Sequence, residues 1–342
     1  MVRKYLSRLV PAVCVAAAMT WSSAAVAQVE KVKVGVIGIL AEAGLYVAAE
    51  RGFFAKENIE VEFLKDTYGA DAFPALATGQ IDAVGGAFGV ELVNAVHRGI
   101  NIRIAGGQSS YVKDFGSGFL MVRKELIDNA RVKSFADLKG LRVALVEPRP
   151  NVTDYFASRY LKQGGLTLND VTPTPIPFAN MITALRTGGV DVAHVSEPLA
   201  SIITGIGAAV KFKPVTDYAP DGFTVAVLHF GPSLLEKRPG VGERLIAGLM
   251  QGARHYMNAL KTPEGKAEMA QILMKYTPVR DRAVYDRIVW SQADPDAAIN
   301  MAGLQDMADY FGTHANTRRV EAASLVDQRF REAALRRLGD HR

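Results

Sequence analysis

The chain has 342 residues, which is too long for one compact core and predicts two domains or two lobes. Hydrophobic residues make up 49% and charged residues 22%, a composition that excludes disordered and collagen-like chains. The formal charge of +5 falls to +2 without the first 27 residues, and no dense Lys/Arg stripe indicates a nucleic-acid partner.

The N-terminus has the pattern of an export signal. Three basic residues among the first eight precede an apolar stretch at 9–19, and Ala25-Val26-Ala27 fits the cleavage rule before Gln28. The pattern predicts a signal peptide at 1–27, the general export route and the periplasm; a buried N-terminal helix is the alternative. The one cysteine, Cys14, lies in the signal, and Val13 before it argues against lipidation. We therefore expect no disulfide or reactive thiol after cleavage.

Strand and helix patterns alternate from residue 32 onward. We expect strands at 32–38, 59–64, 81–85 and 100–105, with helices at 43–51, 71–78 and 90–98. The pattern starts again with strands at 141–146 and 190–195 and helices at 151–163 and 180–187, and the chain from 233 onward is mainly helical. The alternation predicts an α/β fold with mostly parallel sheets.

One segment of the chain is echoed 109 residues later. Ala75–Asp82 and Ala184–Asp191 share five of eight residues. Each copy joins a helix end to a strand through a glycine, Gly79 or Gly188, which permits a left-handed turn. The echo favours two lobes of equal architecture, although helix–strand loops can also converge on similar residues.

Motifs of catalysis and metal binding do not occur in the sequence. It contains no nucleophile elbow, no H-E-x-x-H motif and no phosphate-binding loop, and its six histidines are not paired at ligand spacing. We expect a protein that is not an enzyme and has no catalytic residue, metal or cofactor.

Ligands of open α/β sheets bind beyond the carboxyl ends of the strands. Loops of this kind are expected at 39–42, 87–91, 146–153 and 196–198, with a polar cluster at 108–110. The candidate ligand-binding residues are Glu42, Phe88, Gln108, Ser109, Asn151, Thr153, Ser196, Glu197 and Phe223. The alternative for the Ser, Asn and Thr residues is that they only cap their helices.

The segment Gly44–Val61 resembles a hallmark of solute-binding proteins for nitrate, sulfonates, taurine and thiamine-pyrimidine precursors. Further resemblances lie at 75–82, 137–144 and 184–191 and at Glu197-Pro198, so the similarity runs from about residue 32 to 338. These proteins serve ABC importers.

The resemblance implies a two-lobed periplasmic binding protein fold of type II. One lobe would comprise 28–115 plus 231–342 and the other 116–230, with crossings near Gly116–Arg123 and Phe223–Phe230. It implies a monomer that captures a small organic solute by hinge closure and delivers it to an inner-membrane permease with a cytoplasmic ATPase. The alternatives are a sensor that presents its ligand to a receptor, or an enzyme similar to thiamine-pyrimidine synthase, whose cysteine-rich motif this chain lacks.

The expected cleft loops differ from those of oxyanion binders. Phe88 is apolar, and Glu42, Glu91 and Glu197 would repel an anion unless they turn away or are offset by Arg149. We expect that an amine, an amidine or an aromatic heterocycle suits Phe88 and Glu197 better. The alternative is that the three glutamates complement helix dipoles at the surface.

Overall fold

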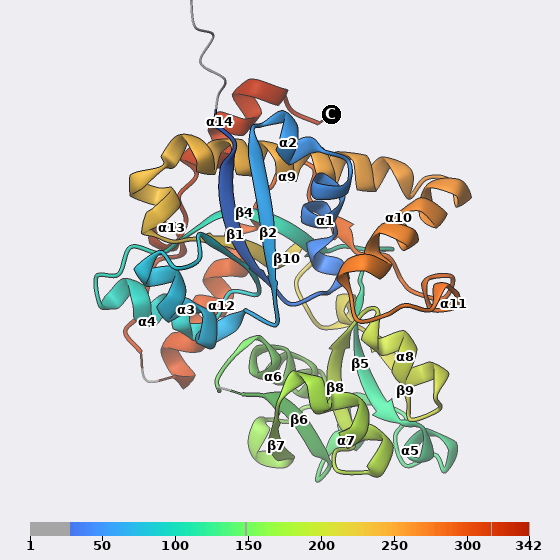
Figure 1. The fold of residues 1–342 in the computed structure, drawn as a ribbon. Coiled ribbons are helices and arrows are strands. Elements are labelled where there is room, and N and C mark those ends of the chain that lie inside the picture. The colour runs from blue at the N-terminus through green and yellow to red at the C-terminus, as the bar shows by residue number, and fades with distance from the viewer. Residues whose placement is uncertain (1–27, 148, 316, 342) are drawn as a thin grey trace, which may run out of the picture.

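The computed structural model describes residues 28–147, 149–315 and 317–341. Two lobes, each with a sheet between helices, are stacked one above the other (Figure 1). This arrangement confirms the predicted two-lobed α/β fold. The predicted signal peptide at 1–27 lies outside the described residues.

The larger lobe contains a six-stranded sheet in the order β2-β1-β3-β10-β4-β11. Strands β1, β2 and β3 are parallel, whereas β10 runs antiparallel to β3 and β4, and β11 antiparallel to β4. The bounds are β1 (Glu30–Val36), β2 (Ile59–Lys65), β3 (Ala83–Gly86), β4 (Arg103–Tyr111), β10 (Phe223–Phe230) and β11 (Gln292–Ala293).

The smaller lobe contains a five-stranded sheet in the order β7-β6-β8-β5-β9. Strands β6, β7 and β8 are parallel, and β5 is antiparallel to both of its neighbours. The bounds are β5 (Gly118–Arg123), β6 (Arg142–Val146), β7 (Thr172–Ile176), β8 (Val192–Ser196) and β9 (Ala209–Pro214). The sheet therefore repeats the order of the first five strands of the larger one, with β5 in the place of β10.

The longest described helix, α9, packs on the larger sheet and also contacts α1 and α14. Gly252 on α9 permits close packing on α1, because a Cβ there would lie 2.1 Å from the Gly44 carbonyl oxygen. The larger lobe carries α1 (Ala43–Glu50), α2 (Phe53–Lys56), α3 (Gly69–Thr78), α4 (Val90–His97), α9 (Pro239–Ala259), α10 (Pro263–Tyr276), α11 (Arg282–Tyr285), α12 (Met301–His314), α13 (Ala322–Leu325) and α14 (Arg329–Leu338).

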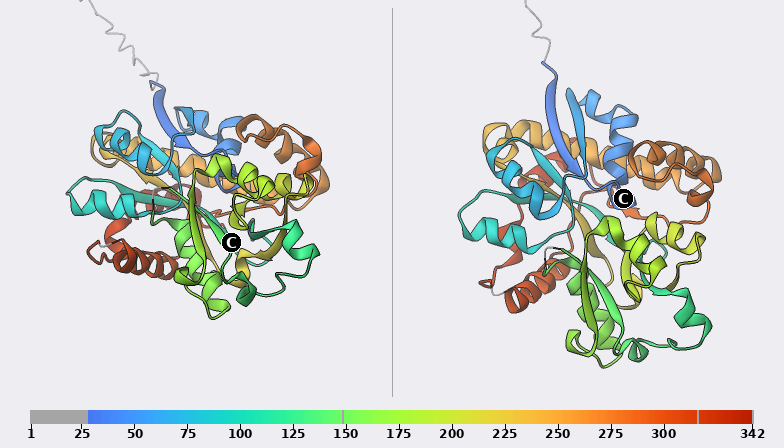
Figure 2. Two further views of the ribbon diagram at one scale, coloured as in Figure 1. Left: turned by 90° about the horizontal axis from the view of Figure 1, so that it is seen from below. Right: turned by 60° about the horizontal axis from the view of Figure 1, so that its bottom comes forward.

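The smaller lobe carries α5 (Lys124–Asp128), α6 (Val152–Gln163), α7 (Met181–Thr187) and α8 (Leu199–Gly205). Helix α6 begins at the predicted N-cap, Asn151, whose side chain accepts a hydrogen bond from the Thr153 backbone N–H. In Figure 2, α6 in green lies beside α12 in red-orange, where the two lobes meet.

The chain crosses between the lobes at places that differ from the expected ones. Phe223–Phe230 was expected to be a crossing, but it is strand β10, hydrogen-bonded to β3 and β4 in the larger sheet. Most of the other expected crossing, Gly116–Arg123, is strand β5. Both segments are extended and apolar because they are buried central strands. The chain passes between the sheets at 112–117 and 215–222 instead.

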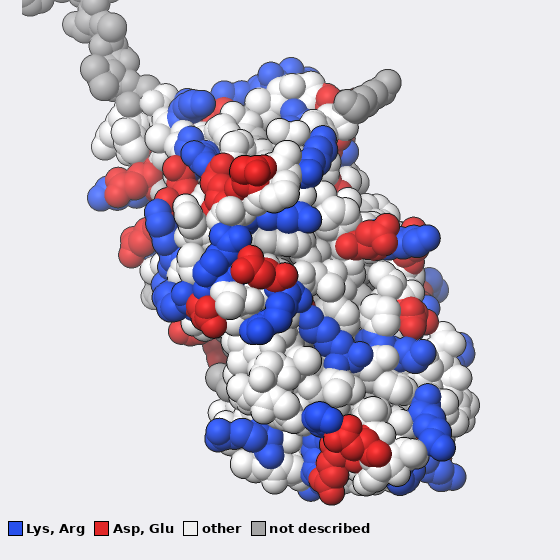
Figure 3. Space-filling model, turned by 90° about the vertical axis from the view of Figure 1, so that its right-hand side faces the viewer, with Lys and Arg blue, Asp and Glu red and all other residues white. Residues whose placement is uncertain are grey.

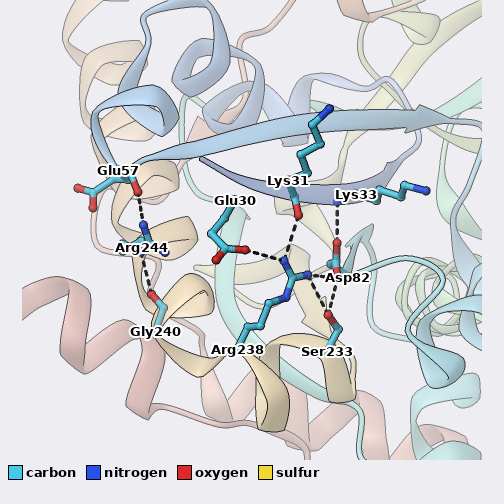
Figure 4. A network of polar contacts seen from close by, with 9 residues as sticks. All are labelled: Glu30, Lys31, Lys33, Glu57, Asp82, Ser233, Arg238, Gly240 and Arg244. Carbon is cyan, nitrogen blue, oxygen red and sulfur yellow. Dashed lines mark hydrogen bonds and ion pairs between the residues drawn. The ribbon is translucent and has the colours of Figure 1, made fainter. Parts of the chain in front are cut away.

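The glycines of the repeated segment have the predicted left-handed conformation, with φ of 77° at Gly79 and 73° at Gly188. Asp82, which is buried and follows Gly79 closely in the sequence, lies at the centre of a polar network. Its carboxylate accepts hydrogen bonds from the Lys33 backbone N–H at 2.8 Å and from Arg238 at 2.6 Å (Figure 4). The network ties β1 to the segment that enters α9.

Lys and Arg side chains alternate with Asp and Glu side chains over both lobes on the face shown in Figure 3. Such a mixed surface gives no single-sign field on this face. No helix among the described residues is long and apolar enough to cross a bilayer.

Candidate functional site

A cleft of about 330 Å³ lies between the lobes. The loops after β1, β2 and β3 line it from the larger lobe, and those after β6, β7 and β8 from the smaller one. These are the carboxyl ends of parallel strands, where ligands of open α/β sheets bind. The volume is at the small end of the roughly 300–1,000 Å³ typical of ligand pockets.

Four of the nine predicted ligand-binding residues line this cleft: Phe88, Asn151, Thr153 and Ser196. The Phe88 ring also packs edge-to-face on Phe311, with ring centroids 5.5 Å apart. The Ser196 hydroxyl lies 3.2 Å from the hydroxyl of Tyr111, which comes from the other lobe. These side chains meet because they lie at the end of β8 or shortly after β3 and β6.

The predicted polar residues Asn151 and Thr153 line the cleft while their side chains serve the start of α6. The Asn151 side chain donates a hydrogen bond to the Val146 carbonyl oxygen. The Thr153 hydroxyl accepts from the Val146 backbone N–H at 2.9 Å. Both therefore also perform the capping role that was the alternative interpretation.

Glu42 lies outside the cleft lining and is fully buried. Its carboxylate accepts hydrogen bonds from the backbone N–H groups of Ile37, Gly38 and Ile39, and from the Tyr46 hydroxyl at 2.7 Å. Burial raises the pKa of the Glu42 carboxyl, against the opposing effect of these hydrogen bonds. The residue holds the β1 loop in shape and is not placed to contact a ligand.

Gln108 and Ser109 also lie outside the lining, because β4 continues past the point where the sequence pattern was expected to end. The strand was expected to end at residue 105, with the polar cluster 108–110 following it. The strand continues there in pairing with β10 and β11, and the segment at Ala298 packs so closely on it that a Cβ on Gly107 would lie 2.0 Å from the Ala298 carbonyl oxygen. The Gln108 side chain donates to the Val227 carbonyl oxygen at 2.8 Å, and Ser109 bonds Ser291.

Glu197 is the third glutamate of the expected loops, and it does not face Phe88 across the cleft. Its carboxylate accepts hydrogen bonds from the Ser201 backbone N–H at 3.0 Å and from Lys211 Nζ at 2.5 Å. It also accepts from the Val289 backbone N–H at 3.2 Å, between α11 and β11 of the larger lobe. Glu197 thus joins the lobes. Phe223, the remaining candidate, lies in β10 and stacks on Tyr155.

Two cleft loops were not predicted from the sequence: the one after β2, which contributes Asp66, Tyr68 and Asp71, and the one after β7, which contributes Pro177 and Phe178. For the loop after β2 the signal was present, because a predicted strand at 59–64 preceded a predicted helix at 71–78, as at the other loops. Glu91 was noted as a loop carboxylate but was not among the candidates, although it lines the cleft.

Glu91 lies in the first turn of α4 and is partly exposed at the cleft. Its carboxylate is surrounded by enough protein atoms that burial raises its pKa to about 7, and the only opposing contact is with its own backbone N–H. No described residue contributes a side-chain hydrogen bond or an ion pair to it. Glu91 is therefore a carboxylate of the cleft without a compensating partner among the described residues, and it is less exposed than the other lining carboxylates, Asp66, Asp71 and Glu147.

Aromatic rings and a neutral histidine form one wall of the cleft. Burial lowers the pKa of His194 to about 3, so its imidazole is uncharged at neutral pH. The ring stacks on Phe156 with centroids 4.4 Å apart, and its Nδ1 lies 2.8 Å from the Tyr218 hydroxyl. Since His194 is neutral, this wall offers stacking surface without positive charge.

The lobes also contact each other beside the cleft. Asp306 on α12 accepts hydrogen bonds from the Tyr155 hydroxyl at 2.5 Å and from Arg159 at 2.9 Å, both on α6. One apolar cluster contains residues of both lobes, among them Phe88 and Phe156. These contacts hold the two lobes together beside the cleft, and we call this the closed arrangement.

Comparison with known families identifies the chain. A model of the family described as NMT1/THI5 like matches residues 41–264. The chain belongs to this family. No curated protein matches the NMT1/THI5-like chain.

Solved structures share the fold of this NMT1/THI5-like protein. A ligand-binding component of an ABC-type import system from Staphylococcus aureus, with zinc bound, is 16% identical with a TM-score of 0.73, over 89% of this chain and 99% of that one. The alkanesulfonate-binding protein SsuA from Xanthomonas axonopodis pv. citri, bound to MOPS, is 18% identical with a TM-score of 0.70, over 88% and 99%. The periplasmic nitrate-binding protein NrtA from Synechocystis PCC 6803 is 16% identical with a TM-score of 0.71, over 91% and 89%.

The same fold also occurs in an enzyme. The desulfurization enzyme DSZB is 16% identical with a TM-score of 0.61, over 90% of this chain and 99% of that chain. The fold alone therefore does not separate binding from catalysis, and the residues of the cleft must carry that argument.

Proposed function

We propose that this protein is the extracytoplasmic solute-binding component of an ABC importer. The observation that carries the proposal is a small cleft closed between two lobes of equal sheet order, in a chain of the NMT1/THI5-like family. A solute that contacts both lobes only in the closed form stabilises closure by its differential affinity. The closed complex then docks on an inner-membrane permease that works with a cytoplasmic ATPase.

A binding role is supported by the chemistry of the cleft. Among the described lining residues, no serine or threonine hydroxyl is hydrogen-bonded to His194, so no nucleophile–base pair is assembled there. The sequence has no cysteine after Cys14. The cleft therefore offers contacts for a ligand without an activated nucleophile.

The proposed location is the periplasm, reached by the general export route after cleavage before Gln28. The protein works as a monomer, since its two lobes already enclose the site. Mass spectrometry of the exported protein is expected to find Gln28 as the first residue, and retention of residues 1–27 would contradict the export step.

The decisive experiment is reconstitution with the inner-membrane permease and the cytoplasmic ATPase that we propose as its partners. In liposomes that contain this transporter, adding the binding protein with its solute is expected to stimulate ATP hydrolysis and uptake. A matched control uses the protein without solute. Tight solute binding without any effect on the transporter would overturn the import role and favour the sensor alternative.

A further inference from the structure

The charged side chains that line the cleft all have the same sign. Asp66, Asp71, Glu91 and Glu147 line it, whereas no lysine or arginine does among the described residues. Asp66, Asp71 and Glu147 are exposed at the rim, and Glu91 is only partly exposed. The one histidine of the lining is neutral. The cleft thus attracts positive charge and repels an oxyanion.

The nearby basic side chains are paired with other acids. Arg149, expected to offset the glutamates, forms an ion pair with Asp154 at 2.6 Å. Lys211 pairs with Glu197. Neither lines the cleft, so neither supplies a counter-ion for an anionic ligand.

Helix starts are the other device by which proteins bind anions, through free backbone N–H groups. Here the starts around the cleft carry acidic side chains of the chain itself. Glu42 accepts the N–H groups of the β1 loop, Asp154 accepts the Asn151 N–H, and Glu197 accepts the Ser201 N–H. Glu91 occupies the first turn of α4. Of these four carboxylates only Glu91 lines the cleft, while the other three occupy N–H groups that could otherwise bind an oxyanion.

Most of the remaining lining residues are apolar or aromatic, and the polar ones among them are Ser117, Asn151, Thr153 and Ser196. Tyr68 of the larger lobe and Phe178 of the smaller lobe are partly exposed in the cleft, with Phe88, Tyr111 and Phe156, each 1% exposed, packed behind its surface. Aromatic faces attract cations, best when the cation is desolvated between them. The volume of about 330 Å³ suits a compact body rather than a long chain.

We propose that the cleft binds a small organic cation, a protonated amine or amidinium on an apolar or aromatic body, with Glu91 as its counter-ion. The proposal rests on the solute-binding function and specifies the class of solute. The positive nitrogen lies at the Glu91 carboxylate, and the body of the ligand packs between the aromatic side chains of the two lobes.

The test uses three probes that share one ring and differ in charge: benzamidine, benzamide and benzoate. Calorimetric titration and thermal shift of the full mature chain are expected to show saturable binding of benzamidine, weaker binding of benzamide and none of benzoate. Glu91→Gln is expected to weaken benzamidine binding by about tenfold to a hundredfold, since charge-assisted hydrogen bonds to ions are lost. Glu62→Gln, an exposed carboxylate outside the lining, is the matched control and leaves affinity unchanged.

Taurine and nitrate are titrated in parallel, because structural neighbours are named for sulfonates and nitrate. Preferred binding of benzoate, taurine or nitrate overturns the cation proposal and leaves the import function intact. The absence of a response to benzamidine and to a panel of primary amines also overturns it. Equal affinity of wild type and Glu91→Gln for benzamidine, in a folded variant, removes Glu91 as the counter-ion. Cation binding without transporter stimulation instead overturns the import function alone.

Discussion

Asp82 and Asp191 make the same pair of backbone hydrogen bonds in two different sheets. The Asp82 carboxylate accepts the Lys33 N–H at 2.8 Å, and the Asp82 N–H donates to the Lys33 carbonyl at 3.0 Å. Asp191 repeats both bonds with Arg142, at 3.0 and 2.9 Å. Each aspartate thus joins the third parallel strand of its lobe to the first. The repeated sequence segment encodes this joint, which explains why its final aspartate recurs.

Asp191→Asn is expected to destabilise the protein by about 1.5–3 kcal/mol at pH 7, the range for hydrogen bonds to a charged group. Although burial alone would raise the pKa of the Asp191 carboxyl, its hydrogen bonds and ion pairs with Arg142 and Arg123 hold it below the usual value. Its stabilising effect is therefore present at neutral pH and is lost as the pH falls through the folded-state pKa. Urea denaturation at pH 7 and at acid pH measures the difference. Asp221→Asn, at an exposed site, is the control, and equal losses in both variants would contradict the role.

Glu91 is expected to make the stability of the ligand-free protein depend on pH. Burial raises the pKa of Glu91 in the folded protein to about 7 from the ordinary value of 4.5, so the folded protein holds a proton that the unfolded chain has released between these values. Stability therefore falls as the pH rises from 4.5 to 7, by no more than about 3 kcal/mol for this group. Glu91→Gln is expected to match wild type at pH 4.5 and to exceed its unfolding free energy at pH 8. Parallel profiles for the two proteins, measured in denaturant, would contradict this.

Breaking the Glu197–Lys211 pair is expected to be costly, because the Glu197 side chain is fully buried. Glu197→Ala leaves the lysine without its partner and removes the acceptor of the Val289 N–H. A loss of about 3–5 kcal/mol is typical when one member of a buried pair is removed. The double change Glu197→Met with Lys211→Met should recover much of it. If the single and the double variant unfold at the same denaturant concentration, the Glu197–Lys211 pair does not stabilise this contact between the lobes.

Asp306 on α12 is expected to favour the closed arrangement. Asp306→Ala removes the acceptor of the Tyr155 and Arg159 hydrogen bonds between the lobes, so the open form gains population and solute affinity falls several-fold. Small-angle scattering without solute should show a larger radius of gyration. Asp309→Ala is the matched control, because Asp309 lies on the same helix and pairs with Arg319 of its own lobe. An unchanged radius in both variants would show that this contact does not bias closure.

The sequence predicted the fold well because each lobe is built from local signals that tertiary packing did not override. Apolar strands, capped helices and left-handed glycines such as Gly79 and Gly188 occur where they were expected. The limits of β4 were not predictable, since its continuation depends on pairing with β10 and β11 and on the close approach of Ala298 to Gly107, all from segments far away in the sequence. The crossings were misplaced for a similar reason, because β10 has the composition of any buried strand.

The site was predictable only to the level of its loops. Strand–helix order located the cleft, but each loop offers several polar side chains, and their directions depend on contacts far away in the sequence. The Glu197 carboxylate accepts hydrogen bonds from Lys211 and from the Val289 N–H, and the Glu42 carboxylate accepts them from the N–H groups of its own loop. Glu91 resembles them in sequence, but no described side chain pairs with it. Only the structure distinguishes these three glutamates.

The acidic side chains at the helix starts also bear on how such a protein changes its specificity over evolution. The fold supplies N–H groups at the mouth of the cleft, and the sequence decides whether a carboxylate of the chain or a group of the solute occupies them. Replacing Glu91 by a short neutral residue would expose the start of α4 without altering either sheet. Preference for cations or anions is thus expected to diverge among relatives of equal architecture through a few substitutions, while the lobes and their closure stay the same.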